Sequence, residues 1–200
     1  LNFIDFKEGD IVIDCGANTG DLLLYFKLKS LNINYIAFEP SPIEFECLRE
    51  NIKPHKAYNV GLWDQEGMMP FYLSSQDADS SLIETKKYDE AINIKTIRLD
   101  SIIDSEVKCL KLEAEGGEPE VLKGLGQKLK LVHYICADVA FERGKEAYST
   151  LAPVTNILLK NGFELVAINH KRISAFYRNT ELTKNNNFEI PKKKALEFMI

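Results

Sequence analysis

The sequence contains no apolar run that approaches the roughly 18 residues needed to cross a bilayer, and no signal peptide is recognisable at its amino end. It also lacks an excess of positive charge, because 25 Lys and Arg face 30 Asp and Glu, for a formal net charge of −5. This balance disfavours a nucleic-acid backbone or an anionic membrane as the main partner. We therefore expect a cytoplasmic protein with no membrane span and no nucleic-acid partner. The sequence does not indicate its oligomeric state.

Cysteine is sparse and scattered. The four cysteines, Cys15, Cys47, Cys109 and Cys136, form no C-x-x-C pair and no cluster with the three histidines, so neither a zinc site nor a disulfide framework is indicated. Three of them lie in apolar runs of strand character, and we expect reduced, buried thiols.

Apolar runs and helical patterns alternate along the 200 residues, which are enough for one α/β domain with a substantial core. The periodicity predicts strands at 11–14, 35–38, 57–60, 69–74, 92–99, 107–112, 131–137, 163–168 and 173–178, and helices at 21–29, 43–51, 119–125 and 148–161. This alternation implies a mostly parallel, doubly wound sheet with an antiparallel hairpin at one edge. We expect one domain over residues 1–180 and a loosely held tail over 181–200, which is rich in Asn and Lys.

The turn after the first predicted strand, DCGANTGD, begins at Asp14. Gly16 and Gly20 permit positive φ and a close approach of backbone to a ligand, and the following helix presents free N–H groups. Because position 18 is Asn, the turn lacks the G-x-G-x-x-G pattern of dinucleotide sites. A smaller ligand with a carboxylate and an amine suits it better, and we expect a bulky residue at Gly16 to block that ligand without unfolding the chain.

An acidic residue, Glu39, ends the second predicted strand. A carboxylate at this place can accept two hydrogen bonds from ribose hydroxyls. The alternative is a solvated acid at a strand end, but the glycine-containing turn ahead of it favours ribose binding.

The stretch LKLEAEGGEPEVLKGL, from Leu110 to Leu125, carries alternating charges. On a continued strand, Lys111, Glu113 and Glu115 share one face. Buried charges must pair or face a polar cleft, so we expect Lys111 to pair with Glu113 and Glu115 to point into a cleft. Glu118 and Glu120 are expected to be acids in the first turn of a helix.

Taken together, the strings DCGANTGD, AFEPSPIEFECLRENI, NVGLWDQEG, SSL, TIRLDSII and LKLEAEGGEPEVLKG resemble, in this order, the motifs of the FkbM-type methyltransferases. These are class I enzymes that use S-adenosyl-L-methionine, and the resemblance covers residues 10–140. It implies a Rossmann-like fold with a mostly parallel seven-stranded sheet and an antiparallel edge hairpin. Two positions depart from the family pattern: Glu113 stands where the family has Asp, and Asp138 is the nearest match to a Glu that usually ends the next strand.

The resemblance also implies roles for residues that bind S-adenosylmethionine. These are Asp14, Gly16, Ala17, Asn18 and Gly20 on the methionine side, Glu39 with Pro40 and Ser41 at the ribose, and Asn59, Val60 and Asp64 at the adenine end. Trp63 is expected to pack rather than to cover the adenine. His133 is expected in the core, and His55 and His170 in solvent.

The implied chemistry is a direct displacement at the methyl group of a sulfonium, for which the protein positions the acceptor and excludes water. A hydroxyl acceptor must also lose its proton to a nearby base. The candidates are Glu115 and Glu113, with Asp138 third. A divalent cation held by these three carboxylates is an alternative, but no ligand spacing supports a metal.

Three functions follow. The first is an O-methyltransferase acting on a hydroxyl of a sugar, glycan or secondary metabolite, where the acceptor class comes from the resemblance. The second is a nicotinamide-dependent oxidoreductase on a similar sheet, which the glycine pattern disfavours. The third is a non-catalytic interaction domain, which the polar residues kept at the strand ends disfavour.

Overall fold

The computed structural model describes residues 1, 3–74 and 80–184. The tail predicted over 181–200 falls outside this range except for residues 181–184, where Thr183 is buried and its hydroxyl donates to the Asn179 carbonyl at 2.5 Å. In the described part of the chain, no helix is both long and apolar enough to span a bilayer.

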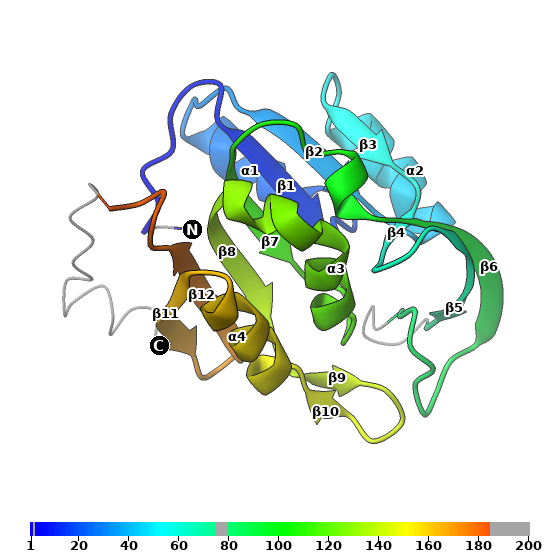
Figure 1. Ribbon diagram of the computed structural model, residues 1–200. Helices are drawn as coiled ribbons and strands as arrows, with labels where there is room; N and C mark the ends of the chain where they lie inside the picture. Colours follow the sequence, from blue (N-terminus) through cyan, green and yellow to red (C-terminus); the bar gives the residue numbers. More distant parts are fainter. Residues whose placement is uncertain (2, 75–79, 185–200) are drawn as a thin grey trace.

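A seven-stranded sheet forms the centre of the molecule, in the order β11-β12-β8-β7-β1-β2-β3 (Figure 1). The five strands from β8 to β3 are parallel, whereas β12 runs antiparallel to both β8 and β11. The predicted mostly parallel sheet with an antiparallel edge hairpin is therefore confirmed. The bounds are β1 (Ile11–Cys15), β2 (Asn34–Phe38), β3 (Lys56–Tyr58), β7 (Val107–Leu112), β8 (Val132–Asp138), β11 (Phe163–Asn169) and β12 (Ser174–Asn179).

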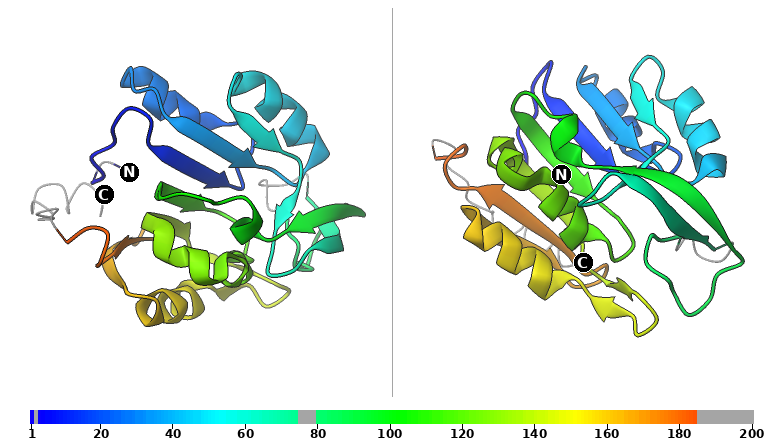
Figure 2. Two further views of the ribbon diagram at one scale, coloured as in Figure 1. Left: turned by 45° about the horizontal axis from the view of Figure 1, so that its top comes forward. Right: turned by 45° about the vertical axis from the view of Figure 1, so that its right-hand side comes forward.

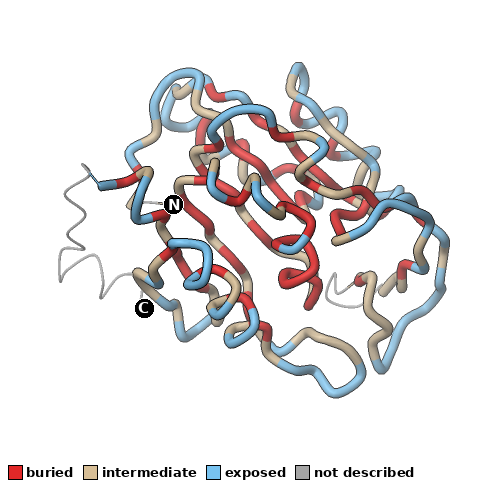
Figure 3. The backbone as a smooth tube through the Cα atoms, in the orientation of Figure 1, coloured by how far each residue is buried: buried red, intermediate tan, exposed pale blue. Residues whose placement is uncertain are grey.

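Helices cover both faces of this sheet, and the left view of Figure 2 shows the three layers edge-on. On one face lie α1 (Asp21–Leu28) and α2 (Pro42–Asn51), and on the other lie α3 (Glu118–Leu125) and α4 (Leu151–Lys160). Successive residues of β1 face the two layers, because side chains alternate along a strand: Val12 belongs to the same buried cluster as Phe26 of α1, and Ile13 to the same buried cluster as Leu122 of α3. Figure 3 shows the resulting buried stretches through the central strands and α3.

A second, three-stranded sheet stands beside the central one. It contains β4 (Gly61–Leu62), β5 (Gly67–Leu73) and β6 (Glu90–Ile97), in the order β4-β6-β5. The predicted pair of strands at 69–74 and 92–99 corresponds to β5 and β6, which are antiparallel. The 3₁₀ helix η1 (Leu99–Ser101) connects β6 to β7, and a second one, η2 (Gly126–Leu131), connects α3 to β8.

A small hairpin, β9 (Phe141–Arg143) and β10 (Tyr148–Ser149), corrects the helix predicted over 148–161. Tyr148 and Ser149 pair with β9 instead of starting the helix. The helix α4 begins at Leu151, whose N–H donates to the Ser149 hydroxyl at 3.1 Å. The start was wrong because two residues of strand are too short to carry a readable period.

Candidate active site

A cavity of about 490 Å³ opens where β1, β2, β7 and β8 end. The chain leaves β1 for β2 on one side, while β7 lies on the other, so this is the point where the strand order reverses and where ligands bind in open α/β sheets. Phe71 of β5 and Leu62 of β4 line the cavity as well, so the second sheet supplies part of its wall.

The turn after β1 is built around Gly16, which has φ +72. The N–H groups of Gly16 and Ala17 both donate to the Phe38 carbonyl at 3.0 Å. An ideal Cβ on Gly16 would lie 1.9 Å from the carbonyl oxygen of Glu113. Gly16 therefore lacks a side chain because the turn after β1 packs closely against the backbone at Glu113. The expectation that a bulky substitution at Gly16 leaves the fold intact is wrong.

Glu39 follows β2 and faces the cavity, although only 7% of its surface is exposed. Its carboxylate accepts the N–H of Asn18 at 2.8 Å and the N–H of Ser41 at 2.8 Å. Burial raises the pKa of Glu39 to about 7, and the two N–H donors only partly oppose this rise. The alternative of a solvated acid at the strand end is excluded.

Three of the residues predicted on the methionine side, Asp14, Ala17 and Gly20, do not line the cavity and instead stabilise the turn after β1. The buried carboxylate of Asp14 accepts the Tyr35 hydroxyl and lies 2.9 Å from Lys111 Nζ. Burial raises the pKa of Asp14, and the Lys111 charge opposes that rise. Ala17 belongs to the core, and a Cβ on Gly20 would collide with Ile52. Gly16 and Asn18 do line the cavity.

At the predicted adenine end, only Val60 lines the cavity directly. Asn59 Nδ2 donates to the carbonyls of Glu39 at 2.8 Å and Pro40 at 3.1 Å, so it fixes the turn that carries Glu39. The Asp64 carbonyl accepts Arg98 Nη1 at 2.9 Å, away from the cavity. Trp63 packs against α3, as expected.

Evidence for the Trp63 packing comes from two glycines. A Cβ on Gly117 would lie 2.9 Å from the Trp63 ring, and a Cβ on Gly124 would lie 2.2 Å from its carbonyl oxygen. The cavity also receives Pro40 and Ser41 from the turn after β2.

Lys111 of β7 connects this strand to β1 beside the cavity. Its Nζ lies 2.9 Å from Asp14, 2.6 Å from Glu113 and 2.8 Å from the Gly16 carbonyl. Burial alone would lower the pKa of Lys111, but the two carboxylates outweigh it and raise the pKa. The predicted pairing of Lys111 with Glu113 is confirmed.

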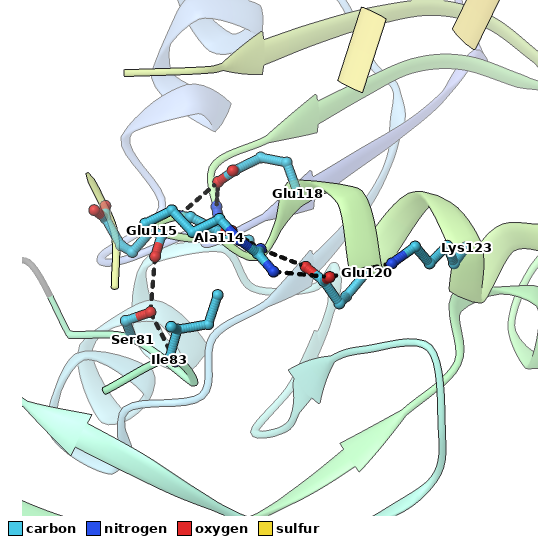
Figure 4. A network of polar contacts seen from close by, with 9 residues as sticks. Ser81, Ile83, Ala114, Glu115, Glu118, Glu120 and Lys123 are labelled. Carbon is cyan, nitrogen blue, oxygen red and sulfur yellow. Dashed lines mark hydrogen bonds and ion pairs between the residues drawn. The ribbon is translucent and has the colours of Figure 1, made fainter. Parts of the chain in front are cut away.

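The segment after β7 is a turn, which corrects its prediction as a continued strand. The strand ends at Leu112, and Glu115 adopts a left-handed conformation with φ +47. The carboxylate of Glu118 terminates the strand pattern, because it accepts the N–H groups of Ala114 at 2.9 Å and Gly116 at 3.1 Å (Figure 4). Glu113, Glu115 and Asp138 nevertheless all line the cavity.

Glu118 and Glu120 therefore do more than favour the start of α3. Glu118 is only 1% exposed, and burial raises its pKa against the opposing backbone donors. Glu120 pairs with Arg143 Nη1 at 2.7 Å, and the same nitrogen donates to the Gly116 carbonyl at 2.5 Å. The turn that carries Glu115 is thus bound by its own helix and by the β9–β10 hairpin.

Asp138 ends β8 and accepts the Ala140 N–H at 3.0 Å. Burial raises the pKa of Asp138. In the described residues, no three His, Cys, Asp or Glu side chains are arranged to hold a metal ion, so the alternative of a cation between Glu113, Glu115 and Asp138 gains no support.

The cysteines and histidines take no visible part in this site, with one exception. Cys15 lines the cavity, but burial raises the pKa of its thiol, and all four cysteines are free. His133 is a partner of Glu106 at 2.8 Å rather than a core residue. His55 lies half-buried against the Tyr35 ring, with 6.1 Å between ring centroids.

Several cavity residues were not identified from the sequence. They come from α2, from the second sheet, from the β9–β10 hairpin and from the turn between β11 and β12: Glu44, Phe71, Glu142 and Arg172. Ser80, Ser81 and Leu82 also line the cavity, and the SSL string was their only sequence signal. Glu142 and Arg172 lie on hairpins whose approach to the strand ends depends on tertiary packing, so no local pattern indicates them.

Known proteins are similar to this chain in sequence and in fold. A family model described as the methyltransferase FkbM domain matches residues 14–165. The curated protein 31-O-demethyl-FK506 methyltransferase FkbM of Streptomyces tacrolimicus is 24% identical over an alignment of 203 positions, gaps included, which covers 82% of this chain and 76% of the relative. Hexuronic acid methyltransferase AglP of Haloferax volcanii is 28% identical over an alignment of 141 positions, gaps included, which covers 66% of this chain and 57% of the relative.

Two solved structures share the fold. Methyltransferase FkbM from Methylobacillus flagellatus KT superposes with a TM-score of 0.64 at 17% identity, over 88% of this chain and 45% of that one. The ribosomal protein L11 methylase of Lactobacillus delbrueckii subsp. bulgaricus gives a TM-score of 0.51 at 11% identity, over 86% of this chain and 71% of that one. The chain thus spans less than half of the first of these structures and between about half and three quarters of the two curated relatives.

Proposed function

Because the chain belongs to the FkbM methyltransferase family, we propose that it transfers the methyl group of S-adenosylmethionine to a hydroxyl oxygen of a sugar, glycan or secondary metabolite. One observation carries this proposal: a single cavity joins the buried carboxylate of Glu39 to the carboxylates of Glu113, Glu115 and Asp138. The carboxylate of Glu39 suits a ribose, and the other three carboxylates suit an acceptor that must lose a proton.

The residues of the cavity fit this cofactor. Each oxygen of Glu39 accepts one backbone N–H, so lone pairs remain for two ribose hydroxyls. The turn with Gly16 and Asn18 lies beside it, and Val60 offers an apolar contact for the adenine. A volume of about 490 Å³ is within the range of small-molecule sites. When bound, S-adenosylmethionine supplies a methyl group on a good leaving group.

Three carboxylates that line the cavity are candidate bases: Glu113, Glu115 and Asp138. Glu113 lies 2.6 Å from Lys111 in an ion pair that also joins Lys111 to Asp14, so we give it a supporting role. We assign proton removal from the acceptor hydroxyl to Glu115, whose turn is held by the hydrogen bonds of Glu118 and Ser81, and we keep Asp138 as the alternative.

The charge of the cavity favours an uncharged hydroxyl as acceptor. Among the described residues, six carboxylates line it, Glu39, Glu44, Glu113, Glu115, Asp138 and Glu142, against one guanidinium, that of Arg172. An anionic acceptor would meet like charges in a partly desolvated site, which is costly. Of the two relatives named above, the one whose name specifies a 31-O position is therefore the better guide to the acceptor than the one that acts on a hexuronic acid.

The test is methyl transfer from tritiated S-adenosylmethionine to a panel of neutral glycosides, with uronic acids of the same sugars as the comparison. We expect transfer to neutral members of the panel and a turnover about 10²–10⁴-fold lower in Glu115→Gln, the usual contribution of a general base. The matched control is Glu146→Gln, which neutralises an exposed glutamate outside the cavity and should keep the wild-type rate. A folded Glu115→Gln protein at the wild-type rate would move the base to Asp138, and faster transfer to the uronic acids would overturn the acceptor class.

A further inference from the structure

Ser81 is a buried residue of the segment between β5 and β6, with 1% of its surface exposed, and it lines the cavity. Its backbone is paired with Tyr72 of β5 in both directions: Tyr72 N donates to the Ser81 carbonyl at 2.8 Å, and Ser81 N donates to the Tyr72 carbonyl at 3.1 Å. The second sheet therefore fixes the place of Ser81 independently of the central sheet.

The Ser81 hydroxyl bridges this segment to the turn after β7. It donates to the carbonyl oxygen of Glu115 at 2.7 Å and accepts the N–H of Ile83 at 3.0 Å (Figure 4). A hydroxyl carries only one donated hydrogen, and in Ser81 that hydrogen is committed to Glu115. Ser81 is thus placed to orient a neighbour rather than to react.

Glu115 needs such a partner because of its backbone. Its φ of +47 is a left-handed conformation that is strained for a residue with a side chain, and it persists only where the surroundings hold it. Glu118 holds the N–H groups on either side of Glu115, at Ala114 and Gly116, and Arg143 holds the Gly116 carbonyl. Ser81 holds the carbonyl of Glu115 itself.

We propose that Ser81 is a positioning residue for Glu115: through its hydrogen bond to the Glu115 carbonyl, it keeps the carboxylate of Glu115 directed into the cavity. The proposal rests on the proposed function, in which Glu115 takes the proton of the acceptor. It makes residues 80–83, which precede β6, part of the catalytic geometry and not only a wall of the acceptor pocket.

The first experiment compares Ser81→Ala with a matched variant of the same segment, Thr85→Val, which removes a hydroxyl that donates to the Lys87 carbonyl at 2.9 Å outside the cavity. With the best neutral glycoside of the panel, we expect kcat of Ser81→Ala to fall about tenfold, the effect of one lost hydrogen bond expressed as a rate. The Kd for S-adenosylhomocysteine should stay within about twofold of wild type. Thr85→Val should keep the wild-type kcat.

The second experiment asks whether Ser81 acts through Glu115. In the Glu115→Gln background, Ser81→Ala should lower kcat by less than about twofold, because residues that act as a unit are not additive. A further tenfold loss there would show a general structural effect and would overturn the proposal. A Glu115→Gln enzyme at the wild-type rate would overturn the proposed base and this inference together, so the two failures are distinguishable.

A third readout needs no turnover. In protein labelled with ¹³C at the glutamate carboxyl groups, the resonance missing from Glu115→Gln identifies Glu115. That resonance should shift in Ser81→Ala and stay in place in Thr85→Val, and an unmoved resonance would contradict the proposal. Ser81→Thr keeps the hydroxyl and should restore kcat. If the alanine variant does not fold, Ser81→Cys provides the same comparisons with a weaker donor.

Discussion

At the scale of single residues, the protonation of Glu39 is the property most open to measurement. Burial raises the pKa of this carboxyl group from its ordinary value of 4.5 to about 7, so the folded chain without ligand holds the proton more tightly than the unfolded chain does. The free energy of unfolding that this group contributes therefore falls as pH rises from about 4.5 to about 7. Ribose hydroxyls donate to the ionised form, so a ligand with a ribose favours loss of that proton.

We accordingly predict that S-adenosylhomocysteine binds more tightly as pH rises. Between pH 6 and pH 8 the affinity should increase about tenfold, because the ionised fraction of a group with a pKa near 7 rises by about that factor. Calorimetry in buffers of different ionisation enthalpy should detect proton release at pH 6. Glu39→Gln cannot titrate and should bind with the same affinity at both pH values. An equally flat profile in the wild type would contradict the role of Glu39.

Residue types alone could predict Glu39, Glu113 and Glu115 as cavity residues, because each stands near the carboxyl end of a strand. They could not predict that Asp14 lies outside the cavity lining, since that depends on Lys111 and Tyr35 reaching it from neighbouring strands. Gly16 illustrates the same limit. The close approach that excludes its side chain is to the Glu113 carbonyl, so a substitution there tests the fold instead of the ligand.

At the scale of elements, the β9–β10 hairpin is the part that sequence patterns missed and that the site depends on. It supplies Arg143, which binds both Glu120 and the Gly116 carbonyl. Six strands of the central sheet have five to seven residues, and they were predicted because apolar runs of this length between turn residues are a strong signal. The short strands β9 and β10 carry no such signal. The assignment of β5 and β6 to a separate sheet carries none either, because their alternation is the same in either sheet.

The hairpin contact should be measurable as stability. Arg143→Ala leaves the nearly buried Glu120 without this partner, and we expect the free energy of unfolding in urea to fall by about 2–3 kcal/mol, less than for a fully buried pair because the Arg143 side chain is 33% exposed. The control is Lys145→Ala in the same hairpin, whose ion pair with Glu84 lies on the surface and should contribute much less to the free energy of unfolding. Equal effects of the two variants would show that the hairpin does not clamp the turn.

At the scale of the whole molecule, the fold brings together residues from four strand ends of the central sheet and from the second sheet around one cavity. The order of the strands could be inferred from the resemblance to a family, but not from the chain's own patterns, which fix the alternation of elements and leave their spatial order open. The solved FkbM methyltransferase shares this arrangement over 88% of the chain. The acceptor side of the cavity is formed by turns, and turn sequences vary without changing the sheet.

The central claim is that this cavity binds S-adenosylmethionine through Glu39, and calorimetric titration with S-adenosylhomocysteine tests it most directly. We expect the wild-type chain to bind S-adenosylhomocysteine and not NAD, and Glu39→Ala to lose about 1.5–3 kcal/mol of binding free energy, the contribution of hydrogen bonds to a charged group. Methionine, which has no ribose, should bind both proteins equally. Binding of NAD in preference to S-adenosylhomocysteine, or an unchanged affinity in a folded Glu39→Ala protein, would contradict the account.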